Sequence, residues 1–176
     1  MDEIKLIPPS KEYSDDIMAF RQEILDLDPD VIFHGCNSLG DFETADAWFD
    51  YLKSLEKEET CPNGFVPASA YIAVRESDNR IVGMTDIRHH INHPILGLWG
   101  GHIGYTVRPS ERRKGYGKKM LQLNLNECRK RNLTKVMLSC TSHNTASERT
   151  ILANGGVFYS EVPVDGEIMK VYWIEL

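Results

Sequence analysis

The segment from Gly101 to Leu121, GHIGYTVRPSERRKGYGKKML, constrains the fold of this chain more than any other. Its pattern predicts an apolar strand at 102–107, a break at Pro109, a basic loop with two glycines, and then a helix. A helix that opens after such a loop presents free backbone N–H groups and the positive end of its dipole. The segment therefore predicts a site for an anion, and phosphate is the anion that best suits it.

The basic loop is Arg112-Arg113-Lys114-Gly115-Tyr116-Gly117. Its glycines let the backbone approach an anion closely, and its cationic side chains add donors at the same place. A Walker loop needs four residues between its glycines, whereas here a single tyrosine separates them. A Rossmann fingerprint needs a third glycine where this chain has Met120. A plain glycine turn with solvated lysines remains an alternative.

The pattern Arg112-x-x-Gly115-x-Gly117 between a strand and a helix resembles the acetyl-CoA pyrophosphate loop of the GNAT N-acetyltransferase superfamily. The segment from Ser142 to Gly156 resembles the second signature of that family, in which an asparagine opens a helix. The resemblance implies a single GNAT domain over residues 1–176. It also implies an α/β (α+β) fold with a mixed, mostly antiparallel central sheet and flanking helices. The strands at 102–107 and 135–140, with one helix between them, are expected to form a parallel βαβ pair.

The resemblance further implies that acetyl-CoA is the cosubstrate. The strand backbone would pair with the pantetheine arm, the loop would hold the pyrophosphate, and Asn144 would contact the arm. The implied cofactor-binding residues are Ile103, Tyr105, Val107, Arg112, Arg113, Lys114, Gly115, Tyr116, Gly117, Lys118, Asn144 and Ser147. For the asparagine segment a structural interpretation is also open, because Thr145-x-x-Glu148 matches a capping box and Gly155 suits a helix C-terminus.

Acetyl transfer to an amine needs a group that takes a proton from the amine. His102 begins the strand before the loop, and its unperturbed pKa of about 6.5 suits this task. Asp86 lies on the preceding predicted strand and could assist it. A hydrogen-bonded, purely structural histidine at the strand end remains the alternative.

The leaving thiolate must also be protonated or stabilised. Many GNAT enzymes use a tyrosine seven residues after the signature asparagine, but this chain has Ile151 there. Tyr105, Tyr116 and Tyr159 are candidate substitutes. The departure keeps open a non-catalytic acyl-CoA-binding regulatory module beside the leading interpretation, an acetyl-CoA-dependent N-acetyltransferase. A dinucleotide-dependent enzyme is a more distant alternative.

Composition and charge argue against nucleic-acid and membrane partners. The 176 residues suffice for one domain with a sizeable core, and a net charge of −6 lacks the basic footprint of a nucleic-acid-binding protein. No apolar run approaches the roughly 20 residues of a membrane span, and the N-terminus does not resemble a signal peptide, so we expect a cytoplasmic protein without a membrane partner.

Metal and disulfide chemistry are not expected. The four cysteines are widely spaced and form no CxxC pair, which argues against zinc or redox sites. Cys128 and Cys140 suit small core positions. His89, His90 and His93 do not suggest a metal site, because neighbours in an extended segment point to opposite faces.

The expected acceptor is a primary amine of a small molecule or peptide. Asp26, Asp28 and Asp30 lie in the loop between the first two predicted helices, which in this superfamily borders the acceptor site. They favour a cationic acceptor, although an ordinary solvated acidic loop is an open alternative. The sequence names no particular acceptor, and a homodimer is left open.

Overall fold

The computed structural model describes residues 2–176 and contains eleven main helices and strands. They are β1 (Ile4–Ile7), α1 (Ser14–Leu25), α2 (Ala45–Leu55), β2 (Ala68–Arg75), β3 (Ile81–Arg88), β4 (Ile103–Val107), α3 (Tyr116–Lys130), β5 (Lys135–Thr141), α4 (Thr145–Leu152), β6 (Val157–Val164) and β7 (Glu167–Glu175). The strands form two sheets, with the orders β1-β2-β3-β4 and β5-β7-β6. All the neighbouring strands in both sheets run antiparallel.

The predicted parallel βαβ pair is not confirmed, because β4 and β5 belong to different sheets. They meet at one end, where the His102 N–H donates to the Met137 carbonyl at 2.8 Å. The Met137 N–H donates in turn to Nδ1 of His102 at 2.9 Å. The second contact uses a side chain in place of a ladder carbonyl, so the two strands do not continue as a regular pair.

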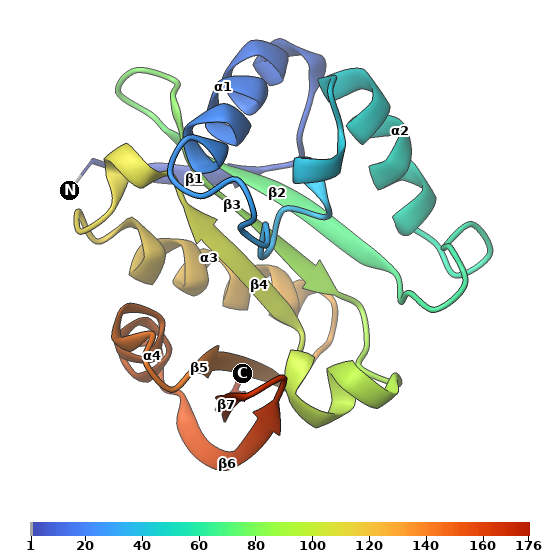
Figure 1. The fold of residues 1–176 in the computed structure, drawn as a ribbon, viewed down its shortest axis with the longest axis vertical. Coiled ribbons are helices and arrows are strands. Elements are labelled where there is room, and N and C mark those ends of the chain that lie inside the picture. Colours follow the sequence, from blue (N-terminus) through green and yellow to red (C-terminus); the bar gives the residue numbers. More distant parts are fainter. Residues whose placement is uncertain (1) are drawn as a thin grey trace.

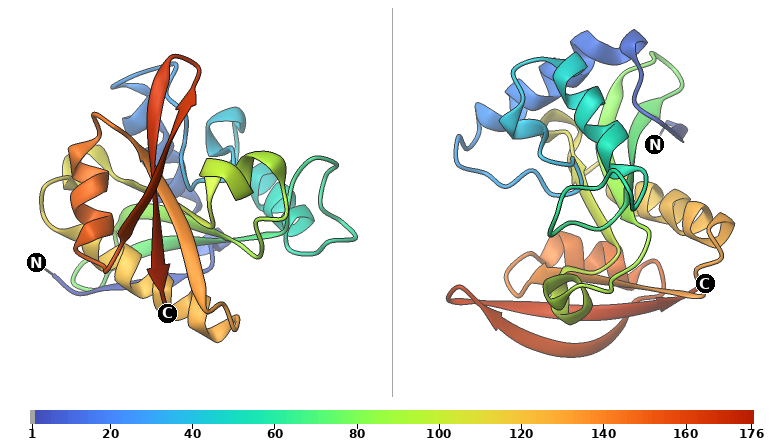
Figure 2. Two further views of the ribbon diagram at one scale, coloured as in Figure 1. Left: turned by 90° about the horizontal axis from the view of Figure 1, so that it is seen from below. Right: turned by 90° about the vertical axis from the view of Figure 1, so that its right-hand side faces the viewer.

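Helices cover both faces of the first sheet. α1 and α2 pack on one face and α3 on the other, which Figures 1 and 2 show as separate layers. The alternation along β2 explains this division, because successive side chains point to opposite faces. Ile72 and Val74 join the core under α1 and α2, whereas Tyr71 and Ala73 face α3.

The smaller sheet packs against α4 and the far part of α3. Ile151 of α4, Leu125 of α3 and Tyr172 of β7 share one buried cluster. Cys128 and Cys140 lie in the same cluster as free, buried thiols, which confirms the expectation that they are core residues.

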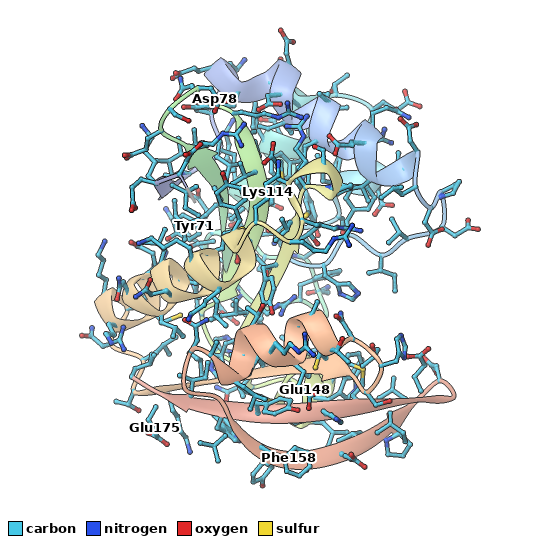
Figure 3. The ribbon with its side chains drawn as sticks, turned by 90° about the vertical axis from the view of Figure 1, so that its left-hand side faces the viewer. Tyr71, Asp78, Lys114, Glu148, Phe158 and Glu175 are labelled. Atoms are coloured by element: carbon cyan, nitrogen blue, oxygen red, sulfur yellow. The ribbon has the colours of Figure 1, made fainter. Side chains whose placement is uncertain are left out.

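The β6–β7 hairpin forms an outer layer of the molecule (Figure 2). Phe158 lies on its outer surface (Figure 3), and about half of its side chain is exposed. Among residues 2–176, no helix is long and apolar enough to cross a bilayer.

Candidate active site

A cavity of about 1140 Å³ lies where the end of β4, the start of α3, α4 and the α1–α2 connection (residues 26–44) meet. It brings together most of the predicted cofactor-binding residues. Those that line it are Tyr105, Val107, Arg112, Arg113, Gly115, Tyr116, Gly117, Lys118, Asn144 and Ser147. The two signature segments, which are about 30 residues apart in the sequence, therefore form two walls of one site.

The charge of the cavity wall suits an anion. Arg112, Arg113, Lys118 and Arg149 contribute four cations, whereas no carboxylate of the described chain is among the lining residues. The N-cap of α3 is Gly115, which adopts a left-handed conformation with φ of 89°. Glycine is the residue that tolerates this conformation, and it leaves the first N–H groups of α3 without a side-chain acceptor.

Gly117 keeps the first turn of α3 open. An added Cβ there would lie 3.4 Å from Cγ2 of Val107 and 3.7 Å from Oγ1 of Thr150, which are ordinary contacts. The protein itself thus has room for a small side chain at this position. A larger side chain at position 117 would extend into the cavity.

Three predicted cofactor residues direct their side chains elsewhere. Tyr116 is buried in the core beside Met120, so only its backbone faces the cavity. Lys114 pairs with Glu111 at 2.9 Å in the loop before α3 (Figure 3). Ile103 is buried in the core cluster under α3. Neither Lys114 nor Ile103 lines the cavity.

Asn144 is the N-cap of α4, and its Oδ1 accepts the backbone N–H of Ser147 at 3.1 Å. The alternative capping box does not form. Glu148 instead accepts hydrogen bonds from the Tyr172 hydroxyl at 2.6 Å and from Nζ of Lys170 at 2.9 Å, toward β7 (Figure 3). The cap uses only Oδ1 of Asn144, so Nδ2 remains as a donor at the cavity wall.

Arg149 is a lining residue that the sequence interpretation missed. Helical spacing could have identified it, because residues three and four positions apart share one face of a helix. Ala146, Arg149 and Thr150 follow this spacing, and all three line the cavity.

Tyr105 is the best placed of the three candidate tyrosines. Its hydroxyl lies 2.9 Å from Oγ of Ser147 across the cavity wall, and burial raises its pKa, so the phenol stays protonated at neutral pH. Tyr116 is in the core, and Tyr159 is exposed on β6, where it packs edge-on against Trp173. Ile151, at the position where the family often has tyrosine, is fully buried.

His102 lies outside the set of cavity-lining residues. Its Nδ1 accepts the Met137 N–H, so in the neutral ring the proton sits on Nε2 and neither nitrogen has a free lone pair. Burial, with a smaller contribution from Arg88, lowers its pKa to about 4. This geometry gives His102 a role in joining β4 to β5, and a catalytic role for it stays an untested prediction.

Asp86 is also buried and also bound to the backbone of β4. Its Oδ1 accepts the Gly104 N–H at 2.9 Å, and its Oδ2 lies 3.4 Å from Nη2 of Arg88. Asp86 does not line the cavity, so its predicted catalytic role also remains untested.

The structure adds His34, which the sequence interpretation did not single out. This histidine lines the cavity from the α1–α2 connection. Oγ1 of Thr106 on β4 donates to its carbonyl at 2.7 Å. A lone histidine in an irregular loop carries no pattern, so no local signal could have identified it.

No cluster of three or more histidine, cysteine or acidic side chains that could hold a metal ion occurs in the part of the chain that the structure describes.

The sequence model of the acetyltransferase (GNAT) family matches residues 36–155, so the chain belongs to this family and is an acyltransferase. No curated protein is similar enough in sequence to count as a match.

Solved structures share the fold over nearly the whole chain. One is yncA of Salmonella typhimurium with acetyl-CoA, at 15% identity and a TM-score of 0.65, covering 98% of this chain and 93% of that one. A second is RimL, a ribosomal L7/L12 α-N-protein acetyltransferase with coenzyme A, at 14% identity and a TM-score of 0.66, covering 98% and 94%. A third is a spermidine N-acetyltransferase SpeG chimera from Vibrio cholerae and hSSAT, at 15% identity and a TM-score of 0.62, covering 97% and 95%.

Proposed function

We propose that the protein transfers the acetyl group of acetyl-CoA to a primary amine of a small molecule or peptide. The observation that carries the proposal is the cavity wall, where four cationic side chains and the open start of α3 surround one space. A pyrophosphate needs this arrangement, since helix N–H groups and guanidinium groups both donate to its oxygens. The yncA and RimL structures, which share the fold, were solved with acetyl-CoA and coenzyme A.

In this proposal each wall of the cavity has one task. The start of α3 and the cations hold the phosphates, while the backbone of β4 near Tyr105 and Val107 and Nδ2 of Asn144 bind the pantetheine arm. The Tyr105 hydroxyl protonates the leaving thiolate, because its raised pKa keeps it a proton donor at neutral pH. Positioning the thioester beside the amine supplies much of the rate enhancement.

The acceptor is proposed to be cationic. A second crevice of about 370 Å³ adjoins the cavity and shares with it the wall formed by residues 31–33. Asp30 and Asp41 line this crevice, so an ammonium group would meet two carboxylates there. The other two predicted aspartates face local partners, since Asp26 accepts from Gln22 and Asp28 accepts from the backbone of Asp30. RimL and SpeG act on amines of a protein and of spermidine.

The second candidate is a non-catalytic acyl-CoA-binding regulatory module. It is favoured by one observation, the burial of Ile151 where a family tyrosine would stand. Family membership and the presence of Tyr105 in the cavity support the enzyme instead.

Release of free CoA thiol from acetyl-CoA, measured with a panel of amines, separates the two candidates. The panel should hold polyamines, aminoglycosides and lysine peptides beside neutral and acidic amines of similar size. We expect amine-dependent release with a preference for the cationic members. Tight acetyl-CoA binding with no release for any amine would favour the regulatory module, and a preference for an acidic amine would contradict the cationic acceptor.

A further inference from the structure

We infer that His34 is the base that accepts the proton of the acceptor amine. The inference rests on the proposed function and assigns its proton acceptor. In the reaction, His34 takes one proton from the ammonium group R–NH₃⁺. The freed amine nitrogen then forms a bond to the thioester carbonyl carbon as the C–S bond breaks. Tyr105 gives its proton to the thiolate and regains one, through water, from the amide nitrogen, and the His34 imidazolium returns its proton to solvent.

The first argument is elimination within the cavity. Among the described residues that line it, the polar side chains other than His34 are hydroxyls, an amide and cations. Hydroxyls and amides take up no proton near pH 7, and guanidinium and ammonium groups already carry theirs. His34 is therefore the one lining group whose ordinary pKa lies near neutral pH.

The second argument is the state of its ring. The chain has six histidines, and five of them use a ring nitrogen for a protein partner. These five are His89 with Ser69, His90 with Glu58, His93 with the Ile95 N–H, His102 with the Met137 N–H, and His143 with Thr141. Within residues 2–176, the ring of His34 has no such hydrogen bond or ion pair, so a lone pair remains for substrate.

The third argument is that the backbone of His34 is held against β4. Besides the hydrogen bond from Thr106, the next residue, Gly35, lies directly on Gly104 with φ of 70°. A Cβ on Gly35 would fall 2.2 Å from the carbonyl carbon of Gly104, so only glycine fits. On the other side, Nε1 of Trp48 donates to the carbonyl of Cys36 at 3.2 Å. The histidine thus stands at a fixed place in a segment that is otherwise irregular.

The charged groups that act on His34 come from β3. Desolvation, followed by the positive charge of Arg88, lowers the pKa of His34, while the Asp86 carboxylate opposes them. β4 contributes the neutral Thr106 and the phenol of Tyr105, whose pKa burial raises. Burial likewise raises the pKa of the neighbouring Cys36 thiol, which stays neutral. The ring is consequently unprotonated at pH 7 and able to accept a proton.

The test compares wild type, His34→Gln and His34→Ala, with His90→Gln as a control histidine outside the cavity. We expect wild-type kcat/KM for a cationic amine to fall on the acidic side, with its midpoint below the ordinary histidine pKa of about 6.5, because burial and Arg88 lower the pKa of His34. In His34→Gln the value at pH 7 should drop by about 10²-fold, the lower range for acid–base catalysis, with unchanged affinity for CoA. The loss should shrink as the pH approaches about 10, where solution supplies the free amine. Added imidazole should restore activity to His34→Ala in proportion to its concentration.

The outcomes separate the inference from the function on which it rests. An active wild type whose acidic limb persists in His34→Gln would overturn the role of His34 and leave the acetyltransferase proposal intact. A wild type that binds acetyl-CoA but releases no thiol with any amine would overturn both. A loss in His34→Gln that is the same at every pH, together with no imidazole rescue of His34→Ala, would mean a structural role.

Discussion

At the scale of single residues, the proposed anion site depends on a small residue at position 117. Gly117 lies in the first turn of α3, where the helix N–H groups face the cavity and have no intrahelical acceptors. The nearest atoms to an added Cβ are at van der Waals distance, so the fold does not itself demand glycine here. In the proposed function, it is the bound pyrophosphate that leaves no room for a larger or acidic side chain.

Replacing Gly117 by glutamate should therefore weaken binding without disturbing the fold. A carboxylate in the first turn is favourable for the helix dipole, but it places negative charge and bulk where the pyrophosphate would lie. We expect Gly117→Glu to weaken CoA binding by tenfold or more, about 1.4 kcal/mol, while Gly117→Ala stays close to wild type. Titration calorimetry with CoA gives the affinities, and thermal melting verifies folding. Wild-type affinity in the glutamate variant would show that the phosphates bind elsewhere.

At the scale of elements, α4 begins at Asn144, which caps the helix and which we propose also binds the cofactor. Asn144 caps the helix through Oδ1, which leaves Nδ2 free to donate to a ligand. An alanine variant would lose both functions together, because removing an N-cap costs about 1 kcal/mol of stability. Aspartate separates them, since it caps a helix as well as asparagine but carries no donor.

We expect Asn144→Asp to keep the melting temperature of the free protein within about 2 °C, as a change well below 1 kcal/mol would give. Its affinity for CoA should fall, because the donor is replaced by a negative charge beside the cofactor. Melting curves and CoA titrations on the same sample measure the two effects. Unchanged affinity together with unchanged stability would leave Asn144 as a cap alone.

At the scale of the whole molecule, the two sheets are joined through His102 at one end. Gly101 precedes it with φ of 70°, and a Cβ there would lie 2.4 Å from the Met137 carbonyl oxygen, so the junction is as close as the backbones allow. At the other end of β4, residues 105–107 line the cavity. The start of β4 thus lies against the second sheet, whereas the end of β4 borders the cavity.

This junction should make stability depend on pH. The pKa of His102 is about 4 in the folded protein and about 6.5 in an unfolded chain. As the pH falls from 6.5 to 4, His102 becomes protonated in the unfolded chain but stays neutral in the folded protein. The free energy of unfolding therefore declines by about 3 kcal/mol over this range.

The His102→Asn variant keeps an acceptor near the position of Nδ1 but does not titrate. We expect it to be less stable than wild type at pH 7, because it loses the ring that packs edge-on against Trp173. Its stability should change less between pH 6.5 and 4 than that of wild type. Urea unfolding at several pH values measures both. Parallel pH dependences in the two proteins would mean that other groups cause the acid sensitivity.

Features encoded in contiguous residues could be predicted from the amino-acid sequence. The loop at 112–117 with the start of α3, and Asn144 with the start of α4, each need only a few neighbouring residues of the right kind. Backbone preferences and helix-end hydrogen bonds act over such short distances, and for this reason the family resemblance could be drawn from them.

The residues that lie opposite these segments could not be predicted, because they come from distant parts of the chain. Gly104 is 69 positions from Gly35, yet their backbones touch and so bring His34 to the cavity. Tyr116 matches the loop pattern, but its ring enters the core because position 116 of α3 faces the first sheet. His102 lies immediately before β4, one residue ahead of the strand that the sequence predicted it to begin, and its ring joins that end of the strand to Met137. These placements depend on how separate elements pack, and a local pattern contains no information about a partner many residues away.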